Sequence, residues 1–179
     1  LVNKILDSDL KNLPFKISDL EMRIEDKIEI TVNGISQSIN LKGRIDRIDE
    51  KDNYPVIIDY KTGYFKSKPI GKKTNEEYFE NIFSDPDYKE YLQGYFYAYS
   101  YLRNNKYMPV KIAIYPLRTI NEGLVFLTEE AVSLKDISLF EKYLIKLMEE
   151  IFHPETSFSQ TDDNKRCSFC PFISICYRE

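Results

Sequence analysis

The chain has 179 residues, 42% of them hydrophobic and 30% charged, with a formal net charge of −4 at pH 7. This composition is typical of a globular domain large enough to bury a sizeable core. The negative net charge excludes a protein that binds nucleic acid through a global positive field, so any phosphate-binding site must be local. No apolar run approaches the roughly 20 residues that span a bilayer, and the N-terminus carries no signal-peptide pattern.

We expect a single domain over residues 1–179, and the first residue, Leu1 rather than Met, suggests a domain taken from a longer protein. Three cysteines stand within the last thirteen residues, too few and too close together for a disulfide framework. Cysteine usage of this kind favours a reducing, cytoplasmic setting.

The first half of the chain reads as strands. Polar and apolar residues alternate in "LEMRIEDKIEITV" and "ISQSINLKGRIDRID" on either side of Asn33-Gly34, a dipeptide typical of a hairpin turn. The run "PVIIDYK" is short and β-branched, as expected of a strand covered on both faces. Residues 64–84 read as a loop, and its first part is rich in lysine: Lys66, Lys68, Lys72 and Lys73.

The second half of the chain alternates between helices and strands. Asp85-Pro86 predicts the start of a helix that runs to about Asn104, with an apolar stripe of tyrosines and leucines. "PVKIAIYPL" and "LVFLT" predict two further strands, and Ser133 with Asp136 forms a capping box before a second amphipathic helix. This order predicts an α/β fold, a mixed β-sheet flanked by helices.

Asp59 and Lys61 project from the same face of the "VIIDYKTG" strand, because residues i and i+2 of a strand share a face. A second carboxylate, Asp46 or Asp49, lies in "GRIDRID" on the preceding strand. Two carboxylates that converge repel each other unless a cation lies between them, and oxygen ligands favour Mg²⁺ or Mn²⁺ over zinc. A lysine beside such an ion can hold the water that attacks a phosphodiester. From this pair alone, a structural ion pair at a strand end is the alternative.

"GRIDRID", "VIIDYKTG" and "YLQGYFYAY", in this order, closely resemble the PD-(D/E)xK nuclease superfamily, and most of all its RecB/AddB-type exonuclease domains and the related CRISPR-adaptation nucleases. The resemblance implies a restriction-endonuclease-like three-layer core. It rests on three pairs of residues: Gly43 with Asp46, Asp59 with Lys61, and Gln93 with Tyr97.

The same resemblance implies the roles of the site residues. Asp46 and Asp59 match the metal ligands, Tyr60 adds its backbone carbonyl, and Lys61 matches the catalytic lysine. Gln93 and Tyr97, four residues apart and therefore on one helix face, are implied near the active site. The alternative for these two is a tyrosine-rich helix face packed on the sheet.

Some residues near these motifs have no assigned role or depart from the family pattern. Arg47 and Asp49 match no catalytic position, although Arg47 could touch a phosphate, and Gly63 is expected to serve a turn that needs positive φ. Relatives often carry an upstream histidine or glutamate as a further ligand. His153 follows all the motifs, so the alternatives are Glu21, Glu25, or a ligand that precedes Leu1 in a longer protein.

The C-terminal segment, residues 164–179, contains Cys167, Cys170 and Cys176 in a C-x₂-C-x₅-C pattern. This group resembles the cysteines that hold an iron–sulfur cluster in AddB-type nucleases, where one distant upstream cysteine completes the set. Thiolate ligation of a 4Fe–4S cluster or of zinc suits this spacing. Because the chain has no upstream cysteine, we expect the site to be incomplete here.

The resemblance implies a Mg²⁺- or Mn²⁺-dependent deoxyribonuclease, expected to be an exonuclease, whose partner is DNA in end processing, recombination or repair. A helicase subunit or domain is the expected neighbour, and no Walker motif is present in this chain. The alternative is a catalytically silent DNA-binding or scaffolding domain of a repair complex. A hydrolase of another phosphoester is a third possibility.

Overall fold

The computed structural model describes residues 2–68, 70, 74–104, 109–157, 159–168 and 170–178. At its centre is a five-stranded mixed sheet in the order β1-β2-β3-β4-β5, in which only β3 and β4 are parallel neighbours. The strands are β1 (Lys16–Val32), β2 (Ile35–Lys51), β3 (Tyr54–Lys61), β4 (Lys111–Pro116) and β5 (Val125–Phe126).

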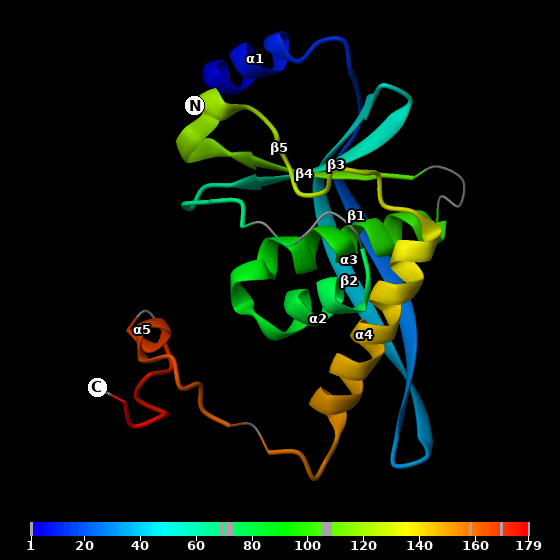
Figure 1. Cartoon of the computed structure of the whole chain (residues 1–179), viewed down its shortest axis with the longest axis vertical. Coiled ribbons are helices and arrows are strands. Elements are labelled where there is room, and N and C mark those ends of the chain that lie inside the picture. Colours follow the sequence, from blue (N-terminus) through cyan, green and yellow to red (C-terminus); the bar gives the residue numbers. More distant parts are fainter. Residues whose placement is uncertain are drawn as a thin grey trace.

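Helices cover the sheet on both faces (Figure 1). The helices are α1 (Val2–Lys11), α2 (Glu76–Ser84), α3 (Lys89–Asn104), α4 (Leu134–Phe152) and α5 (Asn164–Cys167), with short 3₁₀ helices η1 (Pro86–Tyr88) and η2 (Leu117–Glu122). One layer consists of α2, α3 and α4, and the opposite face carries α1 and η2. The predicted α/β sheet flanked by helices is confirmed, and its three layers are consistent with a restriction-endonuclease-like core.

Two hydrophobic clusters lie on the two faces of the sheet. The larger one, between the sheet and the α2–α4 layer, contains the fully buried rings of Phe79, Tyr95 and Phe140. The smaller one lies under α1 and η2. β3 supplies both, because Ile57 belongs to the larger cluster and Ile58 to the smaller one. The expectation that this strand is covered on both faces is therefore confirmed.

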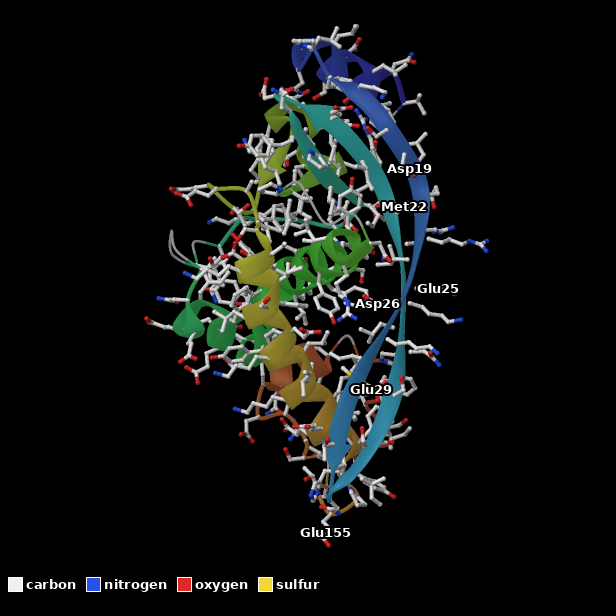
Figure 2. The ribbon with its side chains drawn as sticks, turned by 90° about the vertical axis from the view of Figure 1, so that its right-hand side faces the viewer. Asp19, Met22, Glu25, Asp26, Glu29 and Glu155 are labelled. Atoms are coloured by element: carbon white, nitrogen blue, oxygen red, sulfur yellow. The ribbon has the colours of Figure 1, made fainter. Side chains whose placement is uncertain are left out.

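The β1–β2 hairpin turns at Asn33 (φ 50°) and Gly34 (φ 76°), as the sequence predicts. β1 is an edge strand, and its exposed side chains include the charged residues Asp19, Glu25 and Glu29 (Figure 2). Charges on an edge discourage pairing with another chain. Asp26 points inward instead, toward the helices, where its Oδ2 lies 3.1 Å from Nε of Arg103.

The strands of this hairpin change face at one point. Ile45 and Ile48, three residues apart, both belong to the larger cluster, although strict alternation would place them on opposite faces. The change coincides with Glu21 on β1, which has φ 55°, and with Asp46 opposite it on β2. Asp46 thus lies where β2 changes face, and a separate register shift against β1 falls between Ile17 and Asp19.

The structure corrects two expectations about individual segments. Residues 64–84 are not all loop, because α2 occupies their last part, where the side chain of Asn75 accepts a hydrogen bond from Tyr78 N (2.8 Å). Lys66 and Lys68 precede that helix, whereas Lys72 and Lys73 lie outside the described residues. "LVFLT" forms only the two-residue β5, because just two pairs join it to β4.

The two predicted helices are confirmed. Asp85 caps η1, which leads directly into α3, and Ser133 begins α4 with the expected capping box. Within the described part of the chain, no helix combines the length and the apolarity that a membrane crossing requires.

Candidate active site

Asp46 and Asp59 meet where β2 and β3 lie side by side. The register pairs Arg47 with Ile58, so the next positions along both strands are Asp46 and Asp59. Oδ2 of Asp46 accepts a hydrogen bond from the backbone N–H of Tyr60 at 2.8 Å. The change of face at Asp46 thus holds its carboxylate against the C-terminal end of β3.

Asp59 is the most buried carboxylate of this group, with 7% of the residue exposed. Burial raises the pKa of its carboxyl group, and the negative charges of Asp46 and Glu90 raise it further. The opposing influence is Lys61, whose Nζ lies 2.8 Å from Oδ2 of Asp59. An additional positive charge nearby would therefore stabilise the ionised form of Asp59.

Lys61 is connected to α3 through a short chain of polar groups. Its Nζ donates to Oε1 of Gln93 at 2.5 Å, and Nε2 of Gln93 donates to the hydroxyl of Tyr97 at 2.9 Å. Burial raises the pKa of Tyr97, and the carboxylates of Asp59 and Asp46 add to the effect. Its phenol therefore stays neutral near pH 7 and can fix the orientation of the Gln93 amide.

The position of Gln93 depends on how closely α3 packs on β4. Gly94 lies against Ile112, and a Cβ atom built on the glycine would stand 2.5 Å from Cγ2 of that isoleucine. Any side chain at Gly94 would push the helix away from the sheet. The glycine therefore sets the distance between the Gln93 amide and Lys61.

Arg47 and Asp49 lie on the other face of the sheet. Nε and Nη2 of Arg47 donate to the two carboxylate oxygens of Asp49 (2.7 and 2.8 Å), and Nη1 donates to Asp9 of α1 (2.8 Å) and to the hydroxyl of Tyr60 (3.2 Å). Only 2% of Arg47 is exposed. The suggestion that Arg47 touches a phosphate is wrong, because the guanidinium is buried and all its nitrogens are engaged. Of the two carboxylates left open by the sequence, Asp46 is the one beside Asp59.

Neither glutamate considered as the upstream ligand lies in this group. Glu21 and Glu25 are exposed and form ion pairs with Arg44 (2.8 Å) and Lys42 (3.5 Å) of β2. His153 caps the C-terminal end of α4.

Glu90 is a site neighbour that the sequence interpretation missed. Its side chain is only 15% exposed, and its charge acts on Asp59. The sequence spacing could have identified Glu90, because a residue three positions before Gln93 lies on the same helix face.

Gly63 does not play the expected backbone role. It is not among the glycines with positive φ, which in the described residues are Gly34 and Gly123. A Cβ atom at Gly63 would meet nothing within 4 Å, so neither backbone conformation nor crowding requires glycine there.

The donor set of this site suits a hard divalent cation. Asp46 and Asp59 offer carboxylate oxygens at adjacent strand positions, and the carbonyl of Tyr60 stands between Asp59 and Lys61 in the chain. Mg²⁺ and Mn²⁺ accept such a sparse set because water fills the remaining positions. Among the described residues, no group of three or more His, Cys, Asp or Glu side chains is arranged to hold a metal ion.

The three cysteines lie in the C-terminal segment around α5, each partly buried and free. Cys167 accepts a contact from Nη1 of Arg178 at 3.4 Å, and the backbone N–H of Cys170 bonds to the Cys167 carbonyl at 3.0 Å. Within the described residues, these three cysteines are not arranged close enough together to hold a metal ion. An iron–sulfur cluster or zinc ion at these cysteines stays a prediction.

Two carboxylates and a lysine at the C-terminal end of β3 and the facing position of β2 are the arrangement expected of an enzyme that hydrolyses phosphate esters with a metal ion. The chain belongs to the PD-(D/E)XK nuclease superfamily, whose family model matches residues 1–177. Among solved structures, the protein described as "Crystal structure of SSO0001" is similar to this chain at 20% identity. The match covers 98% of this chain and 67% of that one with a TM-score of 0.41, a likeness too weak to carry a conclusion. No curated protein matches the chain.

Proposed function

We propose that this protein is a Mg²⁺- or Mn²⁺-dependent deoxyribonuclease. The observation that carries the proposal is the convergence of Asp46 of β2 with Asp59 and Lys61 at the C-terminal end of β3, in a chain of the PD-(D/E)XK superfamily. Family membership supports nuclease activity. That the substrate is DNA, and that the domain is a RecB/AddB-type exonuclease, are our inferences from the three sequence motifs.

The proposed division of labour follows from the geometry. Asp46, Asp59 and the Tyr60 carbonyl would hold the divalent ion, which when bound supplies charge stabilisation at the scissile phosphate and a more acidic water. With the Asp59 carboxylate among the ligands of that ion, Lys61 would give up its present 2.8 Å ion pair. The freed ammonium group can then donate to the attacking water or to a phosphate oxygen.

Gln93 and Tyr97 would hold Lys61 in place once Asp59 no longer does. Oε1 of Gln93 already accepts from the lysine, so the ammonium group keeps one protein partner while its other protons face the substrate. The lysine thus arrives oriented rather than free to rotate. Neither Gln93 nor Tyr97 needs to exchange a proton in this scheme.

The cellular role we propose is DNA end processing, recombination or repair beside a helicase, in a reducing, cytoplasmic setting. The motifs of the RecB/AddB-type relatives support this role, and the cysteine segment agrees with it. A 4Fe–4S cluster in a longer form of the protein belongs to the same proposal.

The test is cleavage of end-labelled linear DNA in Mg²⁺, in Mn²⁺ and in EDTA, by the wild type and by Lys61→Ala. We expect divalent-ion-dependent cleavage that falls by roughly 10²–10³-fold in the variant, the usual loss when a charge-stabilising donor is removed. Lys42→Ala, an exposed lysine on the outer side of β2, is the matched control and should cleave normally.

The alternative is a silent DNA-binding domain in which Asp59 and Lys61 form only the structural ion pair that their 2.8 Å contact shows. No ion-dependent cleavage by the wild type, on DNA that it still binds, would establish that alternative and reject the nuclease assignment.

A further inference from the structure

An open groove of about 510 Å³ lies beside the candidate active site and has no part in the metal chemistry described above. The segment that follows β3 forms one wall, and the start of α3 with Arg166 of the tail forms the other. The side chains that matter are Tyr64, Lys66, Lys68, Lys89, Glu90 and Arg166.

The groove adjoins the reactive carboxylates. Glu90 lines it and acts electrostatically on Asp59. On the other wall, Tyr64 follows Lys61 by three residues, so their Cα atoms are at most about 10 Å apart. A strand whose phosphate lies at Lys61 would bring a neighbouring nucleotide into this groove.

The wall that carries Tyr64 is fastened to the helix layer. Phe65 packs against the larger hydrophobic cluster, while the Tyr91 hydroxyl donates to the Lys68 carbonyl at 2.8 Å and lies 3.3 Å from Oγ of Ser67. Tyr64, next to the anchored Phe65, is 75% exposed. A fixed backbone with a protruding aromatic ring is the arrangement that a base can stack on.

The cations of the groove fall into two groups. Lys68 is bound to Asp85 (2.6 Å), and Arg166 is bound to Asp87 (2.8 Å) and Asp163 (2.9 Å), so these two mainly join the walls together. Lys66 is exposed and forms no ion pair with any residue in the described ranges.

Lys89, like Lys66, is exposed and not held in a close ion pair. Its side chain is 76% exposed and reaches a carboxylate only at 3.8 Å. On a chain of net charge −4, Lys66 and the weakly paired Lys89 beside an exposed tyrosine form the kind of local phosphate-binding site that the composition requires.

We propose that this groove is a binding site for single-stranded DNA, in which one base stacks on Tyr64 and the flanking phosphates contact Lys66 and Lys89. The groove would admit a single strand because stacking on Tyr64 needs an unpaired base face. This inference rests on the proposed nuclease function for its choice of ligand, but binding at the groove needs neither the metal nor Lys61.

The test measures binding without cleavage. A fluorescent oligothymidylate longer than the roughly 16 nucleotides that one binding module covers is titrated in EDTA with protein carrying Lys61→Ala. In that background we compare Tyr64→Ala, Tyr64→Phe and Lys66→Ala, and we use a blunt duplex as the second ligand. Tyr54→Ala is the matched control, because Tyr54 is a half-exposed tyrosine at the opposite end of β3.

We expect Tyr64→Ala to weaken binding of the single strand at least about fivefold, the effect of losing one stacked base, while Tyr64→Phe and Tyr54→Ala keep the parent affinity. Lys66→Ala should reduce the slope of log affinity against log salt by about 0.7. Parent-like binding by Tyr64→Ala would overturn the site. Equal losses for single strand and duplex would overturn its preference for an unpaired strand.

These outcomes are separable from those for the proposed function. Loss of cleavage in Lys61→Ala together with parent-like binding in Tyr64→Ala rejects the groove and keeps the nuclease. No ion-dependent cleavage by the wild type, together with weakened binding in Tyr64→Ala, rejects the nuclease and leaves a single-strand binding protein.

Discussion

Two acid–base pairs lie on opposite faces of β2 and β3, and they have the same local sequence pattern. Arg47 and Asp49 are two residues apart on β2, and Asp59 and Lys61 are two residues apart on β3. Arg47 uses every guanidinium nitrogen within the protein, and the side chains of this pair are 3% and 5% exposed. The Lys61 and Asp59 side chains are 25% and 10% exposed.

The second pair also has unsatisfied capacity. Asp59 has like charges nearby at Asp46 and Glu90, and Lys61 can still donate to a further group. The comparison shows that a charged pair at a strand end is structural when all its hydrogen-bonding groups are used inside the protein. It can react when the same groups are left short of partners.

The largest effect should come from Asp59→Asn. Cleavage should fall by about 10³-fold, because the site loses a charged metal ligand. The melting temperature in metal-free buffer should not fall, since burial raises the pKa of Asp59 and its charge therefore opposes folding near neutral pH. Cleavage assays and thermal melts on the same samples check both halves. A clear drop in melting temperature would place Asp59 among the structural pairs.

Arg47→Met should lower the stability of the fold and leave cleavage nearly unchanged. The change leaves Asp9 and Asp49 without their cation, so the free energy of unfolding should fall by about 3–5 kcal/mol. The cleavage rate per folded molecule should stay within about twofold, because Arg47 lies on the far face of the sheet. Denaturant titration gives the stability. Arg47→Met with Asp49→Leu should recover part of the loss, and no recovery would contradict the pairing.

Gly94→Ala should have an intermediate effect through the α3–β4 contact. The new methyl group would meet Ile112, and we expect a loss of about 1–3 kcal/mol in unfolding free energy. Gly63→Ala is the control, because nothing lies within 4 Å of a Cβ atom there and little change is expected. Equal denaturant midpoints for the two variants would show that Gly94 does not set the spacing.

Tyr97→Phe should have the smallest effect. Removing the hydroxyl costs the hydrogen bond from Gln93, worth about 1 kcal/mol, so we expect roughly a fivefold lower kcat with KM unchanged. Lys61 keeps its contact with Gln93 in this variant. A change confined to KM would show that Tyr97 binds substrate rather than positioning the lysine.

Local chemistry explains which elements the sequence predicted. The hairpin at Asn33-Gly34, the capping box at Ser133 and the alternating faces of β3 all depend on residues close together in the chain. α1 was missed although Val2, Ile5, Leu6 and Leu10 recur at helical spacing, and only Ile5 of these four packs on the smaller cluster.

The sequence named the candidate site residues Asp46, Asp59, Lys61, Gln93 and Tyr97, but not the geometry that brings them together and not their neighbour Glu90. The choice between Asp46 and Asp49 depends on the change of face in β2, an irregularity that no alternation pattern contains. The role of Arg47 depends on Asp9, 38 residues earlier in the chain. Such contacts appear only when distant segments fold together.

The central claim is that Asp46 belongs to a metal site and Asp49, three residues later, to a structural pair. Calorimetric titration with Mn²⁺ on the wild type, Asp46→Asn and Asp49→Asn, each first shown to be folded by circular dichroism, tests it most directly. We predict that Asp49→Asn binds Mn²⁺ as the wild type does and that Asp46→Asn binds at least about tenfold more weakly, a difference of about 1.4 kcal/mol. Wild-type affinity in Asp46→Asn, or weakened binding in Asp49→Asn alone, would contradict the claim.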